Sequence, residues 1–509
     1  MTTPTTGTGG TGGTGGNGGT TATGGTVGTG GIGRPMLDRV HGAWEDRVLP
    51  ALTEYTAVRC LSPAFDPDWE AGGHLVAAAR LLADWCRQRS VPGLTAEVVE
   101  RPGRTPVLVV EAPATGGPAD TPALGGVTGP VLVYGHLDKQ PPMGTWRDGL
   151  DPFAAVRDGD RLYGRGTADD GYSVFAAVTA LEVLAADGVP RPRVVVLIEG
   201  SEESGSPDLP AHLDELADRI GRPDLVVCLD SGCLTYDRLW TTASLRGNLV
   251  ATVKVEVLTE GVHSGLAGGV VPSSFRVLRR LLSRIEDQDT GEVLLPELRA
   301  EVPERHRADL AAVAETLPGT VAASLPSVPG LALAGSTEAD RLVARAWAAA
   351  VAVTGMDGIP SVTDGGNVLR PYTTAKLSVR LPPSVDAARA AAALEAALTA
   401  DPPEGARVTV RQEAPADGWL APDPEPWVAG ALEAASMACF DRPPSSYGEG
   451  GTIPFLAMLG ARYPGVQLVA TGVLGPGSNA HGPNEFLHLP MAEAVTVAVA
   501  ELLAAAGRR

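Results

Sequence analysis

His136 and Asp138 stand two residues apart, directly after the apolar run Val131 to Val133. An imidazole and a carboxylate at the end of a buried strand can ligate a metal ion or exchange protons. On its own, such a pair is more often a strand-end histidine beside a solvated acid. It gains weight because four further clusters of metal-type ligands follow apolar runs or glycine-rich turns in the same chain.

These four clusters offer the same ligand types. They are Asp169 and Asp170 in a glycine-rich turn, Glu202 and Glu203 after 194–198, Asp230 after 225–229, and His481 after 466–470. In an open parallel sheet, ligands bind beyond the carboxyl ends of the strands, so we expect these side chains at one sheet edge. Taken singly, the two glutamates suit a solvated loop and the two aspartates a helix N-cap. Together they would repel one another without cations, and imidazole plus carboxylate suits zinc or a similar divalent ion.

One symmetrical arrangement gives each of two metal ions one histidine and one terminal carboxylate, with a further carboxylate between them. Metal ions about 3.5–4 Å apart can hold a hydroxide that attacks near neutral pH. Two adjacent glutamates would then divide into one metal ligand and one general base. The ligand set therefore predicts hydrolytic chemistry.

Short apolar runs without alternation predict strands that are buried on both faces. These runs cover 106–111, 131–135, 193–199, 225–229 and 466–471. The stretches around them predict helices at 36–57, 69–90 and 171–187. Alternation of strands and helices implies an α/β fold, a mostly parallel sheet with helices on both faces.

The middle of the chain differs because apolar and polar residues alternate there, which predicts strands with one wet face. In chain order, the expected elements are a strand at 253–257, a helix at 273–287, a strand at 375–381, a helix at 385–400 and a strand at 407–411. This composition resembles a β-α-β-β-α-β split sandwich. We therefore predict an inserted α+β lid and dimerisation domain at 246–412, between two parts of a catalytic domain at 36–245 and 413–509.

Bulk composition supports a globular, two-domain chain of 509 residues, with 44% hydrophobic and 20% charged residues. A net charge of −20 without basic runs argues against a nucleic-acid partner.

Five irregularly spaced cysteines favour a reduced, cytoplasmic setting. Residues 1–35 are rich in Gly and Thr and predict a disordered arm rather than a signal peptide. The sequence has no uninterrupted run of about 18 apolar residues, the length that a membrane-spanning helix needs.

Five segments carry a family resemblance: Tyr134 to Asp138, Leu162 to Asp170, Glu199 to Ser206, Val262 to Gly265, and Asn479 to Glu485. They resemble the co-catalytic zinc metallopeptidases, which include carnosinase-type dipeptidases, aminoacylases, glutamate carboxypeptidases and acetylornithine deacetylases. The resemblance covers about 40–509 in the family's motif order. The segment Gln140 to Pro142, Trp146, Asp151 to Phe153 and the large inserted domain are most similar to the carnosinase-type dipeptidases.

The resemblance implies a role for each matched position. The metal ligands would be His136 and Asp230 on one ion, Glu203 and His481 on the other, and Asp169 between them. Asp138 would orient His136, and Glu202 would be the general base. His263 would reach the active site of the partner subunit and stabilise the oxyanion. Two divalent ions per chain, zinc first and manganese or cobalt as alternatives, and a homodimer are thereby implied.

Substrate contacts are expected from several further positions. Arg380 lies on the polar face of an alternating strand and would pair with a substrate carboxylate. Gly450, Gly451 and Thr452 precede a predicted helix whose N-terminus would suit the same group, and Asn367 is a further candidate contact.

Two positions depart from the relatives. Gly171 stands where a lysine is usual, and Gly448 where an arginine is usual. Neither removes a metal ligand, but both weaken the expected selection for short peptides.

The sequence thus predicts a dinuclear metallohydrolase that cleaves an amide bond in dipeptides or short peptides through a metal-bridging hydroxide, with Glu202 as base. A deacylase of N-acyl amino acids is the alternative within the family. A metal-free scaffold or binding protein is the alternative from another class. Neither nucleic acid nor membrane is expected as a partner.

Overall fold

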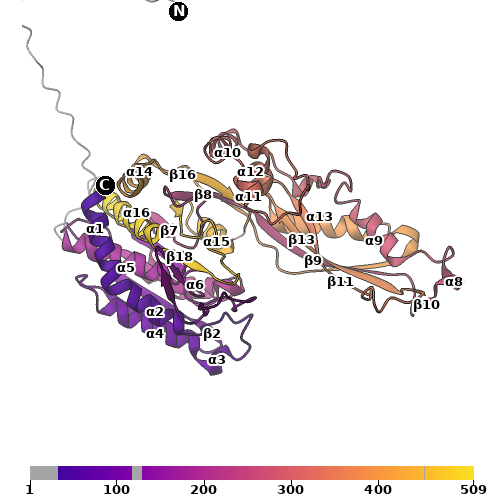
Figure 1. Ribbon diagram of the computed structural model, residues 1–509, viewed down its shortest axis with the longest axis horizontal. Coiled ribbons are helices and arrows are strands. Elements are labelled where there is room, and N and C mark those ends of the chain that lie inside the picture. Colours follow the sequence, from indigo (N-terminus) through magenta and orange to yellow (C-terminus); the bar gives the residue numbers. More distant parts are fainter. Residues whose placement is uncertain (1–32, 117–128, 452) are drawn as a thin grey trace, which may run out of the picture.

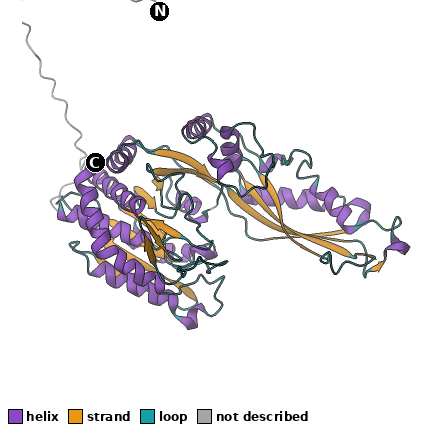
Figure 2. Cartoon of the chain, viewed as in Figure 1, coloured by secondary structure: helices purple, strands orange, loops and turns teal. Residues whose placement is uncertain are grey.

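The structure is a computed structural model that describes residues 33–116, 129–451 and 453–509. Nearly all of the predicted arm at 1–35 lies outside the described residues, and so does Thr452. Figures 1 and 2 show two lobes, an α/β lobe that carries both chain ends of the described part and an elongated lobe that projects from it.

A six-stranded sheet forms the centre of the α/β lobe, in the order β1-β2-β6-β3-β7-β17. Its strands are β1 (Thr95–Arg101), β2 (Arg104–Ala112), β3 (Val131–His136), β6 (Val194–Glu199), β7 (Leu225–Cys228) and β17 (Gln467–Ala470). The strands β6, β3, β7 and β17 run parallel, whereas β1 and β2 pair antiparallel at one edge. The predicted α/β fold is confirmed, and β1 is a strand that the apolar runs did not indicate.

Helices cover both faces of this sheet, as the unbroken burial of β3 and β6 requires. The first face packs against α1 (Gly33–Ala43), the π-helical turn η1 (Trp44–Val48), α2 (Leu49–Ala57), α4 (His74–Arg87), α5 (Tyr172–Ala186), α14 (Pro426–Phe440) and α16 (Leu489–Gly507). The opposite face packs against α6 (Leu209–Glu215), α7 (Ala217–Ile220) and α15 (Pro454–Arg462). The short α3 (Trp69–Gly72) precedes α4.

Helix α16 is long and apolar enough to cross a membrane by length and composition, but 94% of its most apolar window is buried in the fold. Helices at the centre of a protein core have the same composition.

Two small sheets flank the central one. The first contains β4 (Val156–Asp158), β5 (Arg161–Tyr163) and β18 (Phe486–His488), and the second β8 (Trp240–Leu245), β15 (Trp419–Leu420) and β16 (Ser445–Glu449). The strand β18 leads the chain from the loop of His481 into α16.

The projecting lobe is a four-stranded antiparallel sheet, ordered β11-β13-β9-β14, with helices on one face. Its elements are β9 (Gly247–Glu256), α9 (Ser274–Leu282), β11 (Ala350–Asp357), β13 (Tyr372–Leu381), α13 (Ala387–Thr399) and β14 (Arg407–Gln412). The strict alternation of buried and half-buried residues along β9 gives the sheet one apolar face, which α9 and α13 cover. This β-α-β-β-α-β order is the predicted split sandwich, and we call the lobe the lid.

The far tip of the lid consists of β10 (Val262–His263), α8 (Ser264–Ala267) and β12 (Val368–Leu369). The turns η3 (Pro296–Leu298) and η4 (Pro403–Gly405) complete the lid.

A helical segment inside the predicted insertion packs away from the lid sheet. It contains α10 (Glu304–Thr316), α11 (Thr320–Ala323) and α12 (Glu338–Trp347). Leu310, Val313, Leu342 and Trp347 from these helices join the core of the α/β lobe rather than the lid core. The stretch 246–412 therefore contributes side chains to two hydrophobic cores.

Candidate metal centre

The predicted ligands gather at the carboxyl ends of neighbouring parallel strands. His136 is the last residue of β3, Asp230 follows β7, and Glu203 lies in the 3₁₀ turn η2 (Glu202–Ser204) after β6. Because β6, β3 and β7 are adjacent in the sheet, their ends deliver these side chains to one place. Asp169 comes from the turn before α5, and His481 from the loop before β18.

Asp169 lies between the two histidines. Its Oδ1 is 3.2 Å from Nε2 of His136, and its Oδ2 is 3.0 Å from Nε2 of His481. Asp230 Oδ2 lies 3.9 Å from Nε2 of His136, and Glu203 Oε2 lies 3.2 Å from Nε2 of His481. The five side chains thus form two groups of nitrogen and oxygen atoms that share one carboxylate.

The donor set fits divalent cations. Within 33–116, 129–451 and 453–509, Glu203 Oε1 is buried without a hydrogen-bond partner although it belongs to this cluster. The ligand atoms of His136, Asp169 and Glu203 lie within 4.8 Å of one another, and so do those of His136, Glu202 and Asp230. Burying this many carboxylates costs free energy unless cations neutralise them.

The pKa values of the clustered side chains are shifted by their burial and by the neighbouring carboxylates. Burial raises the pKa of Asp230 to about 7, with the neighbouring carboxylates Asp169 and Glu203 adding to the shift. Burial and Asp169 also raise the pKa of Glu203. Hydrogen bonding to Asp169 and Glu203 raises the pKa of His481 to about 11. Raised pKa values for buried carboxylates and for the histidine beside them have one shared cause, which is the excess of negative charge in the cluster.

Asp138 is completely buried and contacts three functional residues. Its Oδ1 accepts a hydrogen bond from the N–H of Glu202 at 3.1 Å, and its Oδ2 accepts one from the N–H of Glu203 at 3.0 Å. Nδ1 of His136 lies 3.1 Å from the main-chain carbonyl of Asp138 and 3.5 Å from its Oδ1. Asp138 therefore orients the turn η2 with its carboxylate and the imidazole mainly with its carbonyl.

Glu485 holds the loop of Asp169, a contact that the sequence interpretation missed. Its Oε1 accepts hydrogen bonds from the N–H groups of Gly166, Ala168 and Asp169 at 3.0, 3.2 and 3.2 Å. Its Oε2 pairs with the buried Arg165 at 2.5 Å. The available signal was an acid that closes the segment Asn479 to Glu485, the same segment that carries His481.

Two residues that the sequence singled out without a role, Gln140 and Asp170, lie directly behind the predicted ligands. Gln140 donates to Glu203 Oε2 at 2.7 Å, and Asp170 Oδ2 accepts the N–H of His136 at 3.1 Å. Asp170 occupies the space above Gly135, where a Cβ would come within 2.5 Å of Asp170 Oδ2. A side chain at position 135 would therefore displace the strand end that presents His136.

Glu199 at the end of β6 is also buried beneath the site. It accepts hydrogen bonds from Tyr134, Ser206 and Ser201, and burial raises its pKa to about 7.

The lid candidates are not brought to this cluster within one chain. His263 and Asn367 lie together at the lid tip, where the carbonyl of Asn367 accepts the N–H of Ser264 at 2.9 Å. In Figure 1 this tip, labelled β10 and α8, is at the far end of the molecule from β7 and β18.

Arg380 and Gly450 lie nearer the junction of the two lobes. Arg246 donates from Nε to the carbonyl of Gly450 at 3.2 Å. Arg380 pairs with Asn248 between β13 and β9, and Asn248 stands two residues after Arg246 in the chain. Burial and the guanidinium of Arg380 lower the pKa of Arg246 to about 10. Gly451 follows Gly450 in the same half-buried loop.

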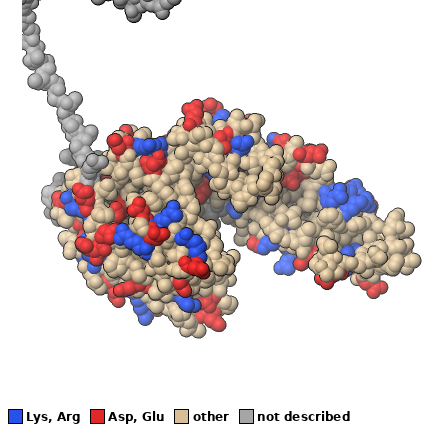
Figure 3. Space-filling model, in the orientation of Figure 1, with Lys and Arg blue, Asp and Glu red and all other residues tan. Residues whose placement is uncertain are grey.

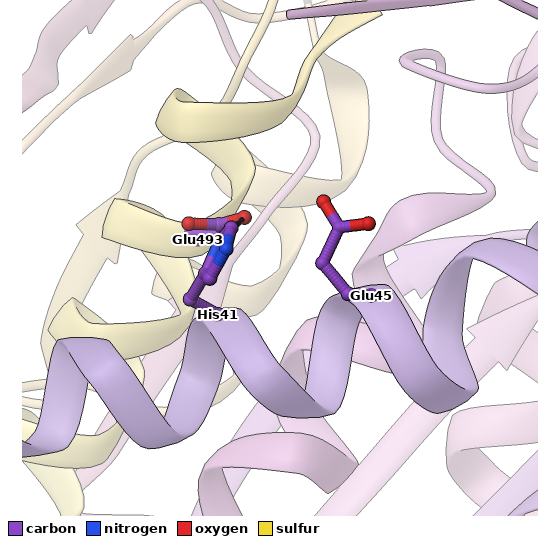
Figure 4. A group of neighbouring side chains, drawn as sticks. All are labelled: His41, Glu45 and Glu493. Carbon is purple, nitrogen blue, oxygen red and sulfur yellow. Dashed lines mark hydrogen bonds and ion pairs between the residues drawn. The ribbon is translucent and has the colours of Figure 1, made fainter.

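A third group of metal-type side chains lies on the helices α1 and α16 and the turn η1 (Figure 4). His41 Nδ1 lies 3.0 Å from Glu493 Oε1. Glu45 is paired through both oxygens with Arg157 at 2.7 and 2.8 Å. Because a cation already neutralises Glu45, this group is an ion-pair contact between helices.

Comparison with known proteins identifies relatives of the whole arrangement. A sequence profile of peptidase family M20/M25/M40 matches residues 132–506. The cysteinylglycine-S-conjugate dipeptidase of Corynebacterium striatum is 27% identical over 384 residues, 74% of this chain and 81% of that protein. The beta-Ala-His dipeptidase of Rattus norvegicus is 33% identical over 174 residues, 33% of this chain and 34% of that protein. The structure of the dipeptidase Dug1p of Saccharomyces cerevisiae superimposes with a TM-score of 0.72 at 21% identity, covering 92% of this chain and 98% of that one.

Proposed function

The chain belongs to peptidase family M20/M25/M40 and is a metal-dependent hydrolase of peptide bonds, and on that premise we propose that it is a dinuclear dipeptidase. The observation that carries this proposal is Asp169, whose two oxygens face His136 and His481 separately. A carboxylate in that position can be shared by two ions.

The proposed ligands divide between two sites. His136 and Asp230 would hold one ion, Glu203 and His481 the other, and Asp169 both. We propose zinc for these sites, because imidazole and carboxylate donors suit it, with manganese and cobalt as alternatives. The chemistry that two such ions supply when bound is polarisation of the scissile carbonyl and a lowered pKa of water.

Glu202 is the proposed general base. Burial, reinforced by the charge of Asp230, raises the pKa of Glu202 well above its usual range. A carboxylate with a raised pKa accepts a proton more readily, which suits a group that takes a proton from water and passes it to the leaving amine. The N–H of Glu202 donates to Asp138, which fixes the main chain from which the carboxylate extends.

The lid is proposed to complete the site of a second copy. Its tip exposes apolar side chains beside His263, with Leu266 79% and Val270 84% exposed. Figure 3 shows few charged side chains at that end of the lid on the face drawn. The edge strand β11 also exposes Val353 and Met356. Exposed apolar groups on an edge strand and a projecting tip suit pairing with another chain. In the proposed homodimer, His263 stabilises the oxyanion in the partner's site, and Asn367 contacts the substrate there.

Arg380 is proposed to bind the substrate carboxylate, with the loop of Gly450 and Gly451 beside it and Thr452 as the next residue. The carbonyl of Gly450 accepts a hydrogen bond from Nε of Arg246 at 3.2 Å, which supports a binding loop beside guanidinium groups. Bidentate pairing with a carboxylate is the interaction that guanidinium groups make best.

For the division of the chain we propose a catalytic domain at 36–245 and 413–509 and a lid domain at 246–412.

All five cysteines are free, which supports the proposed cytoplasmic setting. Deacylation of N-acyl amino acids is the alternative within the family, because the two departures from the dipeptidases loosen the selection for short peptides. A Cβ at Gly171 would lie 2.2 Å from the Tyr55 ring, and one at Gly448 would lie 2.6 Å from Cβ of Ala346. Neither position can therefore regain a cation that would grip a peptide carboxylate.

A substrate panel on metal-loaded protein tests the proposal. Dipeptides with free termini should turn over, and N-acetyl amino acids should react much more slowly. Turnover of N-acetyl amino acids without any dipeptide hydrolysis would replace the dipeptidase with the deacylase. Metal content well below one ion per chain, with no hydrolysis, would instead favour the scaffold.

A further inference from the structure

Lys139 is a completely buried cation that follows Asp138 in the chain. Its Nζ donates to the carbonyls of Tyr55, Thr56 and Val58 at 3.0, 3.1 and 2.9 Å. These carbonyls lie at the C-terminal end of α2, where a helix leaves its last acceptors unsatisfied and attracts positive charge. Within the described ranges of the chain, the hydrogen bonds of this ammonium all go to main-chain carbonyls.

The main chain on both sides of Asp138 is held by the same segment, 55–62. Tyr55 donates from its hydroxyl to the carbonyl of Leu137 at 2.8 Å, and the Lys139 ammonium lies 4.1 Å from the centre of its ring. Lys139 donates its N–H to the carbonyl of Cys60 at 2.9 Å and accepts the N–H of Ser62 at 3.0 Å. Asp138 thus sits between two anchored residues.

The segment also reaches the turn that carries the proposed base. The hydroxyls of Ser62 and Ser204 are 2.5 Å apart, and Ala64 donates its N–H to the Ser204 hydroxyl at 2.9 Å. Gly166 in the loop before Asp169 leaves room for the Lys139 side chain, since a Cβ there would lie 2.7 Å from Lys139 Cε. Lys139 therefore lies in the loop after β3, packs against the loop of Gly166, and is linked through Ser62 to the turn η2.

We propose that Lys139 is a positioning residue: its ammonium fixes the chain around Asp138 to the end of α2, so that Asp138 keeps His136 and the turn of Glu202 and Glu203 in register. This inference rests on the proposed metal-dependent function. An apolar residue of similar length would fill the same space, but it would remove three hydrogen bonds from a charged donor. The carbonyl of Tyr55 would keep only the N–H of Val58, at 3.0 Å, and the main-chain bonds of Lys139 to Cys60 and Ser62 would hold the segment less firmly.

The test compares Lys139→Met with Tyr55→Phe and with a matched control, Lys254→Met. Methionine keeps the length of the side chain and removes the ammonium. Phenylalanine keeps the ring and removes only the bond to Leu137. Lys254 places its ammonium 4.8 Å from the Tyr372 ring in the lid, so its replacement removes a similar contact away from the site.

The full-length, metal-loaded proteins are assayed for kcat, KM, thermal midpoint and the rate of metal release into a chelator. Lys139→Met should lower kcat and speed metal release by about 10-fold to 100-fold, as loss of groups behind metal ligands does, and leave KM within about twofold. Tyr55→Phe should shift both in the same direction by a smaller factor. Lys254→Met should match the unmodified chain.

A Lys139→Met protein with a lower thermal midpoint but unchanged kcat and metal release would overturn the proposal, because the residue would then serve stability alone. If this variant fails to fold, Tyr55→Phe decides: unchanged kcat and metal release there would also overturn it. Absence of metal and hydrolysis in the unmodified chain would reject the proposed function instead, so the two failures are distinguishable.

Discussion

Asp169 Oδ2 lies 3.0 Å from Nε2 of His481, which joins the turn before α5 to a loop near the C-terminal end of the chain. The other oxygen of Asp169 faces His136. His481 is the outermost side chain of the cluster, with 56% of it exposed, whereas the His136 side chain is fully buried. The two proposed metal sites should therefore differ in how readily they lose an ion.

The first prediction concerns the exposed ligand. His481→Ala should lose about one metal ion per chain and should lower turnover by more than the roughly 10–100-fold that loss of an outer partner costs. Elemental analysis and kinetics on the same preparation check this. His41→Ala is the control, because His41 pairs with Glu493 in the ion-pair group between helices and should keep full metal content. Equal metal loss in both variants would contradict the assignment.

The second prediction concerns Asp138. In Asp138→Asn, the side-chain amide would point an N–H toward the N–H of Glu202 or Glu203, so one donor would lose its acceptor. We expect kcat to fall by about 10–100-fold with a smaller change in metal content. Asp208→Asn is a matched control, since Asp208 accepts the N–H of Thr105 at 2.9 Å away from the ligands. A fall in kcat of the same size in the control would remove the special role of Asp138.

The third prediction tests whether His263 acts across a dimer. His263→Ala and Glu202→Gln should each be inactive. When the two variants exchange subunits, a hetero-dimer would hold one complete site, because the partner supplies the missing histidine. Random pairing should restore about one quarter of normal activity in a twofold-symmetric dimer. Mixtures that stay inactive although subunit exchange is demonstrated would place His263 outside the partner's site.

The fourth prediction concerns pH and the helix contact of His41. The hydrogen bond to Glu493 raises the pKa of His41 above 6.5, with the charge of Glu45 adding to the shift and Arg157 opposing it. A raised pKa in the folded state means that the stabilisation is complete below pH 6.5 and is lost as pH rises through the folded value. His41→Gln should therefore lower the thermal midpoint near pH 6 and have little effect near pH 9. A constant difference across that range would contradict the charge-dependent contact. The effect should be small because the side chain is 58% exposed.

The gathering of the proposed ligands was predictable because strand ends of a parallel sheet converge. His136, Glu203 and Asp230 each follow an apolar run, and β3, β6 and β7 are neighbours in the sheet. An apolar run gives no strand direction, however, so the antiparallel β1 and β2 could not be foreseen. The helices α10 to α12 each carry buried apolar side chains, but their sequence does not say which of two cores they join.

The supporting residues were harder to predict because their partners are distant in sequence. Glu485 reads as a loop acid until its three N–H donors between Gly166 and Asp169 are known. Lys139 has no signal of burial in the local sequence, and part of the space that it fills is open because Gly166 has no side chain. The contacts of Glu485 and of Lys139 both join segments that are far apart in the sequence, and no local sequence pattern indicates that these segments meet.

Glu202→Gln tests the central claim most directly, because it removes the proposed base without removing a proposed metal ligand. Metal content and dipeptide turnover should be measured on the same preparation, beside the unmodified chain. We predict unchanged metal content, close to two ions per chain for the pair of sites that share a carboxylate, and turnover lowered by at least about 100-fold, as expected for loss of a general base. A Glu202→Gln protein that keeps normal turnover, or that loses its metal together with its activity, would contradict the division of roles between Glu202 and Glu203.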